Sequence, residues 1–391
     1  MMNLPDRIER PGAEWYSSAK MLGGCLREEM EKYEDFYLFS PDETGSNKLD
    51  EVFEVTSRAW VRGVLPWDKN LAPDGKVVEL LSENVLFAVL AGHILSGGRG
   101  AMTSYEAFLP IVSSQIDQHL KFLKQSKEIK WRPDYAALNL LSTSCWQRQD
   151  HNGYTHQNPA VISALLTKPS ALVNCFFPVD DVAAAVAWEK AGQMKNVVNV
   201  ITFNKTEEPR WIDADHARFQ LENGGASVFG FATDANPDMV FAGVGDIPSK
   251  ELLWARDIVK YEMPEVKIKF VGIAALSYGA IGTTENRLTQ ELFDEYFTVD
   301  KPILANFHGY AESLRGILGR YADNGRLEVH GYEDQGSTTT PLDMLIRNRC
   351  DRYSLAWACF EWLGRGDLAE KYRGVIEEKV MYAQEFGVDK D

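Results

Sequence analysis

The chain has 391 residues, of which 45% are hydrophobic and 25% are charged, as in ordinary globular proteins. This length is enough for two or three domains, each with its own core. The formal net charge of −16 argues against a nucleic-acid partner and against an anionic membrane surface as a partner.

Near residue 50 the sequence changes from a polar, irregular segment to alternating helix and strand patterns. Residues 1–50 are polar and irregular apart from an amphipathic helix predicted over 17–33, which indicates an N-terminal linker or arm. From 51 to 223 helical and strand patterns alternate, and this predicts an α/β domain. Its expected elements are a buried helix over 77–95, a helical segment over 107–122, strands at 173–177 and 197–203, and helices over 180–194 and 213–225.

A second alternation follows a break near 224–237 and predicts a C-terminal α/β domain over 224–391. Its expected elements are strands at 238–244, 266–275, 302–307 and 327–331, and helices over 249–261, 289–296, 311–321, 341–363 and 368–386. Continuous apolar strands alternating with helices are typical of parallel sheets covered on both faces. The predicted fold class is therefore α/β, with two doubly wound domains.

The five cysteines are scattered and lack CxxC spacing, so we expect reduced cysteines and no zinc site. The N-terminal sequence lacks the apolar core of a secretory signal. No uninterrupted apolar run reaches the ~18 residues of a membrane span. A cytoplasmic protein with no membrane partner is the resulting expectation.

The most polar stretch is Gln149–Pro159, QDHNGYTHQNP, which follows the hydrophobic segment ALNLLSTSCW. So much hydrogen-bonding capacity after a strand indicates either a site on a strand-to-helix loop or a polar surface loop. His151 and His156 suit proton transfer near neutral pH. Their spacing does not place both on one helical face and no third ligand is nearby, so we predict no metal site there.

Three other segments carry candidate chemistry. Glu83 lies in the apolar segment LLSENVLFAVLAGHIL. It is either a buried carboxylate, which is costly without a partner, or an exposed residue at a helix start beside Ser82. Tyr105 and Phe108 belong to SYEAF, which is expected to open a helix. Their rings either bind a ligand or pack as ordinary core aromatics. Lys205 follows a buried strand and is either a phosphate contact or a surface lysine.

The segment WQRQDHNGYTHQNP is similar to the WRQDHNGFSHQDP signature of phosphoketolases. Further segments resemble this family in the family's order: SPDETGSNKLDEVFEVT at 40–56, GRGAMTSYEAF at 98–108, DKPILANFHGY at 300–310 and VHGYEDQGSTTTPLDM at 329–344. Collinear strings are more specific than a single motif. The resemblance runs from about residue 22 to 355 and covers only the C-terminal half of a phosphoketolase.

The resemblance implies a transketolase-like fold, with a thiamine-pyrimidine-binding domain over 51–223 and a transketolase C-terminal-like domain over 224–391. It implies thiamine-diphosphate-dependent cleavage of xylulose 5-phosphate or fructose 6-phosphate by inorganic phosphate, which yields acetyl phosphate and an aldose phosphate. For the cofactor, the resemblance implies Glu83, Phe108 and Glu43, which forms an acidic pair with Asp42 beside the site. For substrate phosphate it implies Ser46 with the neighbouring Asn47, Tyr105, Asn152 and Lys205, and for catalysis Gln149, His151 and His156, with Glu83.

The sequence departs from the family in two ways. Thiamine enzymes hold Mg²⁺ and the diphosphate with GDG followed by Asn-Asn, but Gly245-Asp246 is followed by Ile247 and no such motif is present. The family's LSEH…WLEGYLLTGRHG has become LSEN…VLAGHILSGGRG. We therefore expect the Mg²⁺–diphosphate ligands to lie in the missing N-terminal half.

Met1 at the domain junction favours a natural half-enzyme whose partner is a separate diphosphate-binding subunit, in a homo- or hetero-oligomer. Two alternatives stay open. The chain is a non-catalytic, phosphoketolase-like assembly or regulatory protein, or it is an artificially truncated phosphoketolase.

Overall fold

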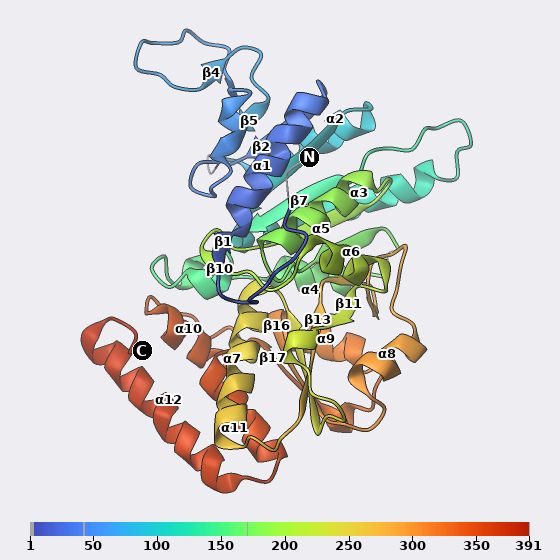
Figure 1. Cartoon of the computed structure of the whole chain (residues 1–391). Helices are drawn as coiled ribbons and strands as arrows, with labels where there is room; N and C mark the ends of the chain where they lie inside the picture. The colour runs from blue at the N-terminus through green and yellow to red at the C-terminus, as the bar shows by residue number, and fades with distance from the viewer. Residues whose placement is uncertain (1–3, 42–43, 170, 391) are drawn as a thin grey trace. The chain divides into compact units, whose positions relative to one another are not determined.

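The computed structural model describes residues 4–41, 44–169 and 171–390 (Figure 1). The chain divides into two compact units, unit 1 with residues 1–144 and 170–218 and unit 2 with residues 145–169 and 219–391. The polar loop at 149–159 therefore belongs to unit 2, although the chain on both sides of 145–169 belongs to unit 1. Within the described ranges no helix is long and apolar enough to cross a membrane.

Unit 1 is built on parallel strands in the order β8-β9-β7-β6-β2-β5-β3-β4. Their bounds are β2 Phe36–Ser40, β3 Arg58–Ala59, β4 Leu71–Ala72, β5 Val77–Glu79, β6 Arg99–Tyr105, β7 Leu138–Thr143, β8 Val173–Phe176 and β9 Val198–Thr202. A separate antiparallel pair joins β1, Trp15–Ser17, to β10, Glu207–Pro209. The parallel strands confirm the α/β expectation, and their carboxyl ends share one edge of the sheet.

The helices of unit 1 are α1 Ser18–Lys32, α2 Glu83–Leu95, α3 Ser113–Ser126 and α5 Asp181–Gln193, with 3₁₀ turns η1 Asp50–Glu54 and η2 Glu106–Val112. Helix α6, Ala214–Glu222, begins in unit 1 and ends in unit 2. α1 packs against α5, and α2 packs against β6 and η2. The region 1–50, expected to be an arm, holds both α1 and β2, and β2 pairs with β5 and β6.

Three sequence predictions for unit 1 were wrong in detail. The single helix expected over 77–95 is β5 followed by α2, because Ser82 caps α2 by accepting a hydrogen bond from the Val85 amide. The helix expected over 107–122 is η2 followed by α3, with Pro110 inside η2. Tyr105 ends strand β6 instead of opening a helix.

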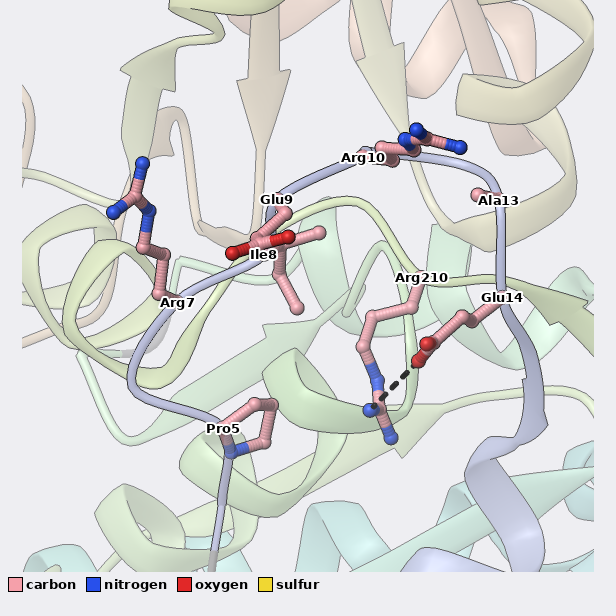
Figure 2. A pocket seen from close by; sticks show the side chains of 8 residues that line it. All are labelled: Pro5, Arg7, Ile8, Glu9, Arg10, Ala13, Glu14 and Arg210. Atoms are coloured by element: carbon pink, nitrogen blue, oxygen red, sulfur yellow. Dashed lines mark ion pairs between the residues drawn. The ribbon is translucent and has the colours of Figure 1, made fainter.

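The N-terminal segment of unit 1 forms one wall of a cavity of about 450 Å³ beside Arg210 (Figure 2). The guanidinium of Arg210 is held by Asp181, at 2.9 Å from Nε to Oδ1, and it lies 4.0 Å from Glu14. The side chains of Arg7 and Arg10 also line this cavity, but Figure 2 shows that they do not converge on Arg210. The cavity thus lacks a concentrated positive charge.

Unit 2 has its own sheet in the order β11-β13-β12-β16-β17, in which β11 alone is antiparallel to its neighbour. The strands are β11 Ala226–Val228, β12 Met239–Val244, β13 Ile268–Ile273, β16 Ile303–Tyr310 and β17 Leu327–Tyr332, with a hairpin of β14 Ala275–Ser277 and β15 Ala280–Ile281. These strands confirm those expected from the sequence at 238–244, 302–307 and 327–331.

The helices of unit 2 are α4 Ala160–Leu166, α7 Asp246–Glu262, α8 Gln290–Phe297, α9 Ala311–Leu318, α10 Pro341–Arg347, α11 Arg352–Trp362 and α12 Gly366–Phe386, with short 3₁₀ turns η3 Trp146–Arg148, η4 Tyr154–His156, η5 Gly230–Ala232 and η6 Asn324–Arg326. The helix expected over 341–363 is two helices. Arg349 has a φ of 52° between them, and Asp351 caps α11 by accepting hydrogen bonds from the amides of Tyr353 and Ser354.

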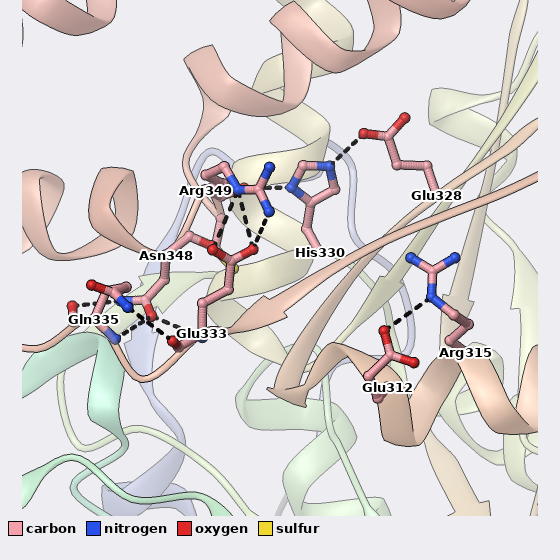
Figure 3. A network of polar contacts seen from close by, with 9 residues as sticks. Glu312, Arg315, Glu328, His330, Glu333, Gln335, Asn348 and Arg349 are labelled. Atoms are coloured by element: carbon pink, nitrogen blue, oxygen red, sulfur yellow. Dashed lines mark hydrogen bonds and ion pairs between the residues drawn. The ribbon is translucent and has the colours of Figure 1, made fainter.

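A polar network ties the α10–α11 junction to β17 (Figure 3). The Arg349 carbonyl lies 2.8 Å from Nδ1 of His330, whose Nε2 lies 3.0 Å from Glu328. The Arg349 guanidinium forms an ion pair with Glu333, and Oδ1 of Asn348 accepts from the Glu333 amide at 2.9 Å. These contacts satisfy the polar groups that the helix break exposes.

Candidate active site

Three predicted phosphate-binding side chains come together at the carboxyl edge of the unit 1 sheet. Tyr105 ends β6, and its hydroxyl lies 3.4 Å from Oγ of Ser46 and accepts a hydrogen bond of 3.4 Å from Nζ of Lys205. The ammonium of Lys205 also lies 4.8 Å from the centre of the Tyr105 ring. A hydroxyl, a phenol and an ammonium that converge are suitable donors for a phosphate group.

Phe108 belongs to the same group through its ring. It lies parallel to the Tyr105 ring, with 6.2 Å between the ring centres and 12° between the planes. Both rings are half-buried, so part of each faces outward. An aromatic face in this position is available to stack against a flat ligand.

Sequence reasoning missed the buried hydroxyl groups beneath this cluster. Asn47 is fully buried, and its Oδ1 accepts hydrogen bonds from Thr143 and, at 3.3 Å, from Ser144. Thr143 is the last residue of β7 and Ser144 follows it, with a φ of 51°, which is unusual for a residue with a side chain. The run STSC in the sequence was the available signal. These contacts fix the backbone next to Ser46.

A second missed residue is Ser17, which fixes the chain at Lys205. Its hydroxyl donates to the Lys205 carbonyl at 3.0 Å and also accepts from the Lys20 amide at the start of α1. The Ala19 amide donates to the carbonyl of Asn204. The segment that carries Lys205 is therefore held by the N-terminus of α1.

Glu83 is the first residue of α2 and is half-buried. Among the residues that the structure describes, its carboxylate has neither a hydrogen-bond nor an ion-pair partner. The helix start favours a negative charge there, but it supplies no donor side chain. A half-buried carboxylate without a partner fits a ligand that offers an N–H group.

The positions where this chain departs from the family lie at the other end of α2. His93 Nε2 lies 2.7 Å from the Asp35 carbonyl and 3.1 Å from that of Arg99. A side chain at Gly98 would overlap the His93 ring. His93 thus fills the space that the family's arginine would need at position 98.

The polar loop of unit 2 runs from η3 to α4, so it is the expected strand-to-helix connection after β7. Gln149 is fully buried, and its Oε1 accepts from Asn152 Nδ2 at 2.6 Å. Gln157 Nε2 donates to the Gln149 carbonyl and to the carbonyl of Ser337. A side chain at Gly153, with φ of 74°, would overlap Thr338. The loop therefore has one fixed course.

The two loop histidines differ in their surroundings. His151 is exposed and has no hydrogen-bond partner within the described part of the chain. His156 is half-buried, with Nδ1 2.9 Å from the Thr155 hydroxyl. Nε2 of Gln149 is buried without a partner among the described residues. These groups can donate, accept or transfer protons.

The predicted site residues are distributed over both units. Ser46, Glu83, Tyr105, Phe108 and Lys205 belong to unit 1. Gln149, His151, Asn152 and His156 belong to unit 2. Glu43, expected with Asp42 beside the cofactor, lies outside the described residues.

Two family models account for nearly the whole chain. The model described as D-xylulose 5-phosphate/D-fructose 6-phosphate phosphoketolase (XFP) matches residues 20–192, and the XFP C-terminal domain model matches residues 205–391. The chain belongs to the phosphoketolase family. A probable phosphoketolase from Nitrosospira multiformis is 39% identical over 352 residues, which cover 88% of this chain and 44% of that protein. The chain spans about half the length of the curated phosphoketolases it matches.

Solved transketolase structures are similar to this one. A Pichia stipitis transketolase in complex with sedoheptulose 7-phosphate has a TM-score of 0.66 at 13% identity, over 95% of this chain and 48% of that one. A split-gene transketolase described as an inactive β4 tetramer has a TM-score of 0.57 at 13% identity, over 88% of this chain and 96% of that one. This confirms the transketolase-type α/β fold expected of a phosphoketolase.

Proposed function

We propose that this chain is the pyrimidine-binding and C-terminal part of a phosphoketolase that cleaves xylulose 5-phosphate or fructose 6-phosphate with inorganic phosphate. The products are acetyl phosphate and an aldose phosphate. The observation that carries the proposal is the convergence of Ser46, Tyr105 and Lys205, which come from distant parts of the sequence. Such a group has little structural value on a surface, since exposed polar contacts contribute weakly to stability.

The residues of unit 1 fit the pyrimidine end of thiamine diphosphate, the cofactor of phosphoketolases and transketolases. The Glu83 carboxylate, which has no partner among the described residues, would accept a hydrogen bond from the aminopyrimidine, and Phe108 would stack on its ring. When bound, the cofactor supplies the nucleophilic carbon that cleavage of a ketose requires. The chain has no GDG motif for Mg²⁺ and the diphosphate.

The remaining roles in this proposal are those that the family resemblance implies. Lys205, Tyr105 and Ser46 would bind substrate phosphate, with Asn152 as a further contact. His151 and His156 would move the hydroxyl protons that ketose cleavage requires, and Gln149 would hydrogen-bond a sugar hydroxyl.

The partner in this proposal is a separate polypeptide that holds Mg²⁺ and the cofactor diphosphate. The two polypeptides assemble in a homo- or hetero-oligomer, and activity requires both of them. The split-gene transketolase supports it, because that chain, matched over 96% of its length, is described as an inactive β4 tetramer.

The test is a phosphate-dependent acetyl phosphate assay. The chain is mixed with the part of the Nitrosospira multiformis phosphoketolase that it does not match, together with Mg²⁺, thiamine diphosphate and each ketose phosphate. Glu83→Gln should lower turnover by about 100-fold, the typical effect of losing a positioned proton-transfer group. Lys205→Met should raise KM for the ketose phosphate by roughly 10- to 100-fold, as for a lost charge-assisted hydrogen bond. Lys121→Met, at an exposed lysine, is the matched control.

Activity that Glu83→Gln leaves unchanged would disprove the assigned site. The non-catalytic alternative predicts no acetyl phosphate from any mixture, and it predicts that Glu83→Gln is neutral or stabilising. Melting temperatures of both variants separate these outcomes from misfolding.

A further inference from the structure

The loop that carries the two candidate proton-transfer histidines lies against a second loop of unit 2. The first, residues 149–159, is called the histidine loop below, and the second is the β17–α10 loop, residues 333–340. At the start of the histidine loop, the Thr339 amide donates a hydrogen bond of 3.2 Å to the Asp150 carbonyl. The β17–α10 loop contains none of the proposed site residues.

The two loops also meet at the end of the histidine loop. Gln157 Nε2 donates to the Ser337 carbonyl at 3.1 Å. The hydroxyl of Tyr332, the last residue of β17, donates to the Gln157 carbonyl at 3.0 Å and lies 3.2 Å from Oδ1 of Asp334. Between these points the Tyr154 hydroxyl donates to the Asp334 carbonyl at 3.2 Å. Gln157 and Tyr332 are buried, so the loss of their contacts is costly.

The backbones of the two loops approach each other too closely for side chains at two glycines. A Cβ added at Gly336 would overlap the Tyr154 ring and the Gln157 side chain. On the other loop, a Cβ added at Gly153 would overlap the Thr338 hydroxyl. Because close-packed groups cannot move independently, a shift of the β17–α10 loop must shift the histidine loop as well.

One buried side chain, that of Asn348, fixes the β17–α10 loop (Figure 3). Asn348 is fully buried, and its Oδ1 accepts hydrogen bonds from the amides of Glu333, at 2.9 Å, and Gln335, at 3.4 Å. Its Nδ2 donates to the carbonyls of Gln335, at 3.2 Å, and Met344, at 3.0 Å. The side chain thus pairs with both backbone groups of residue 335, which uses the amide as donor and as acceptor.

The end of α10 presents Asn348 to this loop. Asn348 directly follows α10, and Arg349 beside it has a φ of 52°. The Arg349 guanidinium adds an ion pair with Glu333, but its side chain is 56% exposed. Exposed ion pairs contribute little to stability, whereas buried hydrogen bonds are costly to lose. Asn348 is therefore the stronger of the two contacts.

We infer that Asn348 is a positioning residue for His151 and His156. It acts through the β17–α10 loop, whose contacts at Asp150 and Gln157 hold the residues directly before His151 and directly after His156. The inference rests on the proposed function, in which these histidines move hydroxyl protons. A positioning role affects turnover more than binding of substrate phosphate.

Hydrogen exchange measured by mass spectrometry on the full chain tests the structural part. Asn348→Leu leaves the amides of Glu333 and Gln335 without their acceptor. Peptides from both loops should then exchange at least about tenfold faster, and peptides from α12 should be unchanged.

The matched control is Asn286→Leu. Asn286 Nδ2 also donates to two main-chain carbonyls of unit 2, those of Leu221 and Glu222. This variant loses a comparable pair of hydrogen bonds, and it should leave exchange in both loops unchanged.

The kinetic part uses the reconstituted mixture described above. Asn348→Leu should lower kcat by about 10- to 100-fold, as for a catalytic group displaced by ~1 Å, and should change KM for the ketose phosphate by less than about threefold. Tyr332→Phe is a milder variant, because it removes only the hydroxyl that binds the Gln157 carbonyl and keeps the ring against Trp146. It should lower kcat in the same way. If Asn348→Leu does not fold, Tyr332→Phe decides by both measurements.

The inference is overturned if exchange of the histidine loop is unchanged in the folded variants, or if exchange rises equally throughout unit 2. An active mixture in which both variants keep the unmodified kcat overturns it as well. An unmodified mixture that makes no acetyl phosphate defeats the proposed function itself, and the positioning role falls with it.

Discussion

Three buried asparagines form a hydrogen-bonded row across the sheet of unit 1. Asn174 Nδ2 donates to Asn199 Oδ1 at 2.8 Å, and Asn199 Nδ2 donates to Asn139 Oδ1 at 2.9 Å. The row arises because Asn199 is in register with both neighbours, on β8 and β7. Buried amides are tolerated when each has a partner.

We expect Asn199→Val to lower the free energy of unfolding by about 2–4 kcal/mol, because it leaves polar atoms of both neighbours buried without partners. Asn139→Val, at one end of the row, should cost less. Replacing all three by Val should recover part of the loss. Urea denaturation measures each value, and a single Asn199→Val variant as stable as the unmodified chain would contradict the role of the row.

His119 on α3 is a buried histidine with no role in the proposed chemistry. It is 5% exposed, its ring meets that of Phe87 edge-on, and its Nε2 has no partner among the described residues. Burial lowers its pKa from 6.5 to about 4. The unfolded chain therefore takes up a proton near pH 6.5, whereas the folded chain does so only near pH 4.

Stability should accordingly fall as the pH drops from about 6.5 to 4, by on the order of 2–3 kcal/mol from this residue. His119→Leu should flatten the pH dependence of the unfolding free energy in that window. His151→Gln, at an exposed histidine, should leave it unchanged. An identical slope in His119→Leu and the unmodified chain would show that other groups set the acid sensitivity.

At the scale of elements, the end of α2 and the start of β6 pack through His93 and Gly98. The family carries tyrosine and arginine at these two positions, so this chain has exchanged one packing arrangement for another. The carbonyls of Asp35 and Arg99 fix the His93 ring in the space beside Gly98.

Gly98→Arg should therefore destabilise the fold by about 1–3 kcal/mol, a typical cost of overpacking. Adding His93→Ala should relieve part of that cost, and the two changes should be non-additive by at least about 0.5 kcal/mol. Gly92→Arg is the control, since position 92 has open space. Additive effects in chemical denaturation would show that His93 does not occupy the space in question.

At the scale of the whole molecule, two segments of unit 1 expose large apolar side chains. The loop between β3 and β4 presents Val61 and Trp67, 92% and 73% exposed, and the region of α2 presents Leu81, Val85 and Val89. Exposed apolar surface is typical of regions that bind another protein.

We expect the isolated chain to self-associate in a concentration-dependent way, with the exposed side chains of the β3–β4 loop among the contacts. Trp67→Ser combined with Val61→Ser should shift the molar mass measured by light scattering towards the monomer. Trp131→Ser removes a tryptophan that is 79% exposed elsewhere in unit 1, and it should have no such effect. A monomer at every concentration of the unmodified chain would refute this expectation.

The sequence by itself determined the family, the α/β class and most elements whose signals are local. Helix α5 begins at its capping Asp180, and β9 coincides with the run VNVIT, which is rich in β-branched residues, because caps and strand propensity are encoded within a few residues. Family resemblance, not local pattern, selected the site residues. Their roles stay predictions.

The tertiary structure alone decided which of these residues meet. Ser46, Tyr105 and Lys205 converge because parallel strands bring their carboxyl ends to one edge, whatever their separation in sequence. Side-chain caps and one left-handed residue produce the breaks between β5 and α2 and between α10 and α11. The apolar sequence pattern continues across both breaks, so it does not reveal them. The placement of residues 145–169 in unit 2 depends on packing such as that of Trp146 with Tyr332, a contact between distant residues that no local pattern encodes.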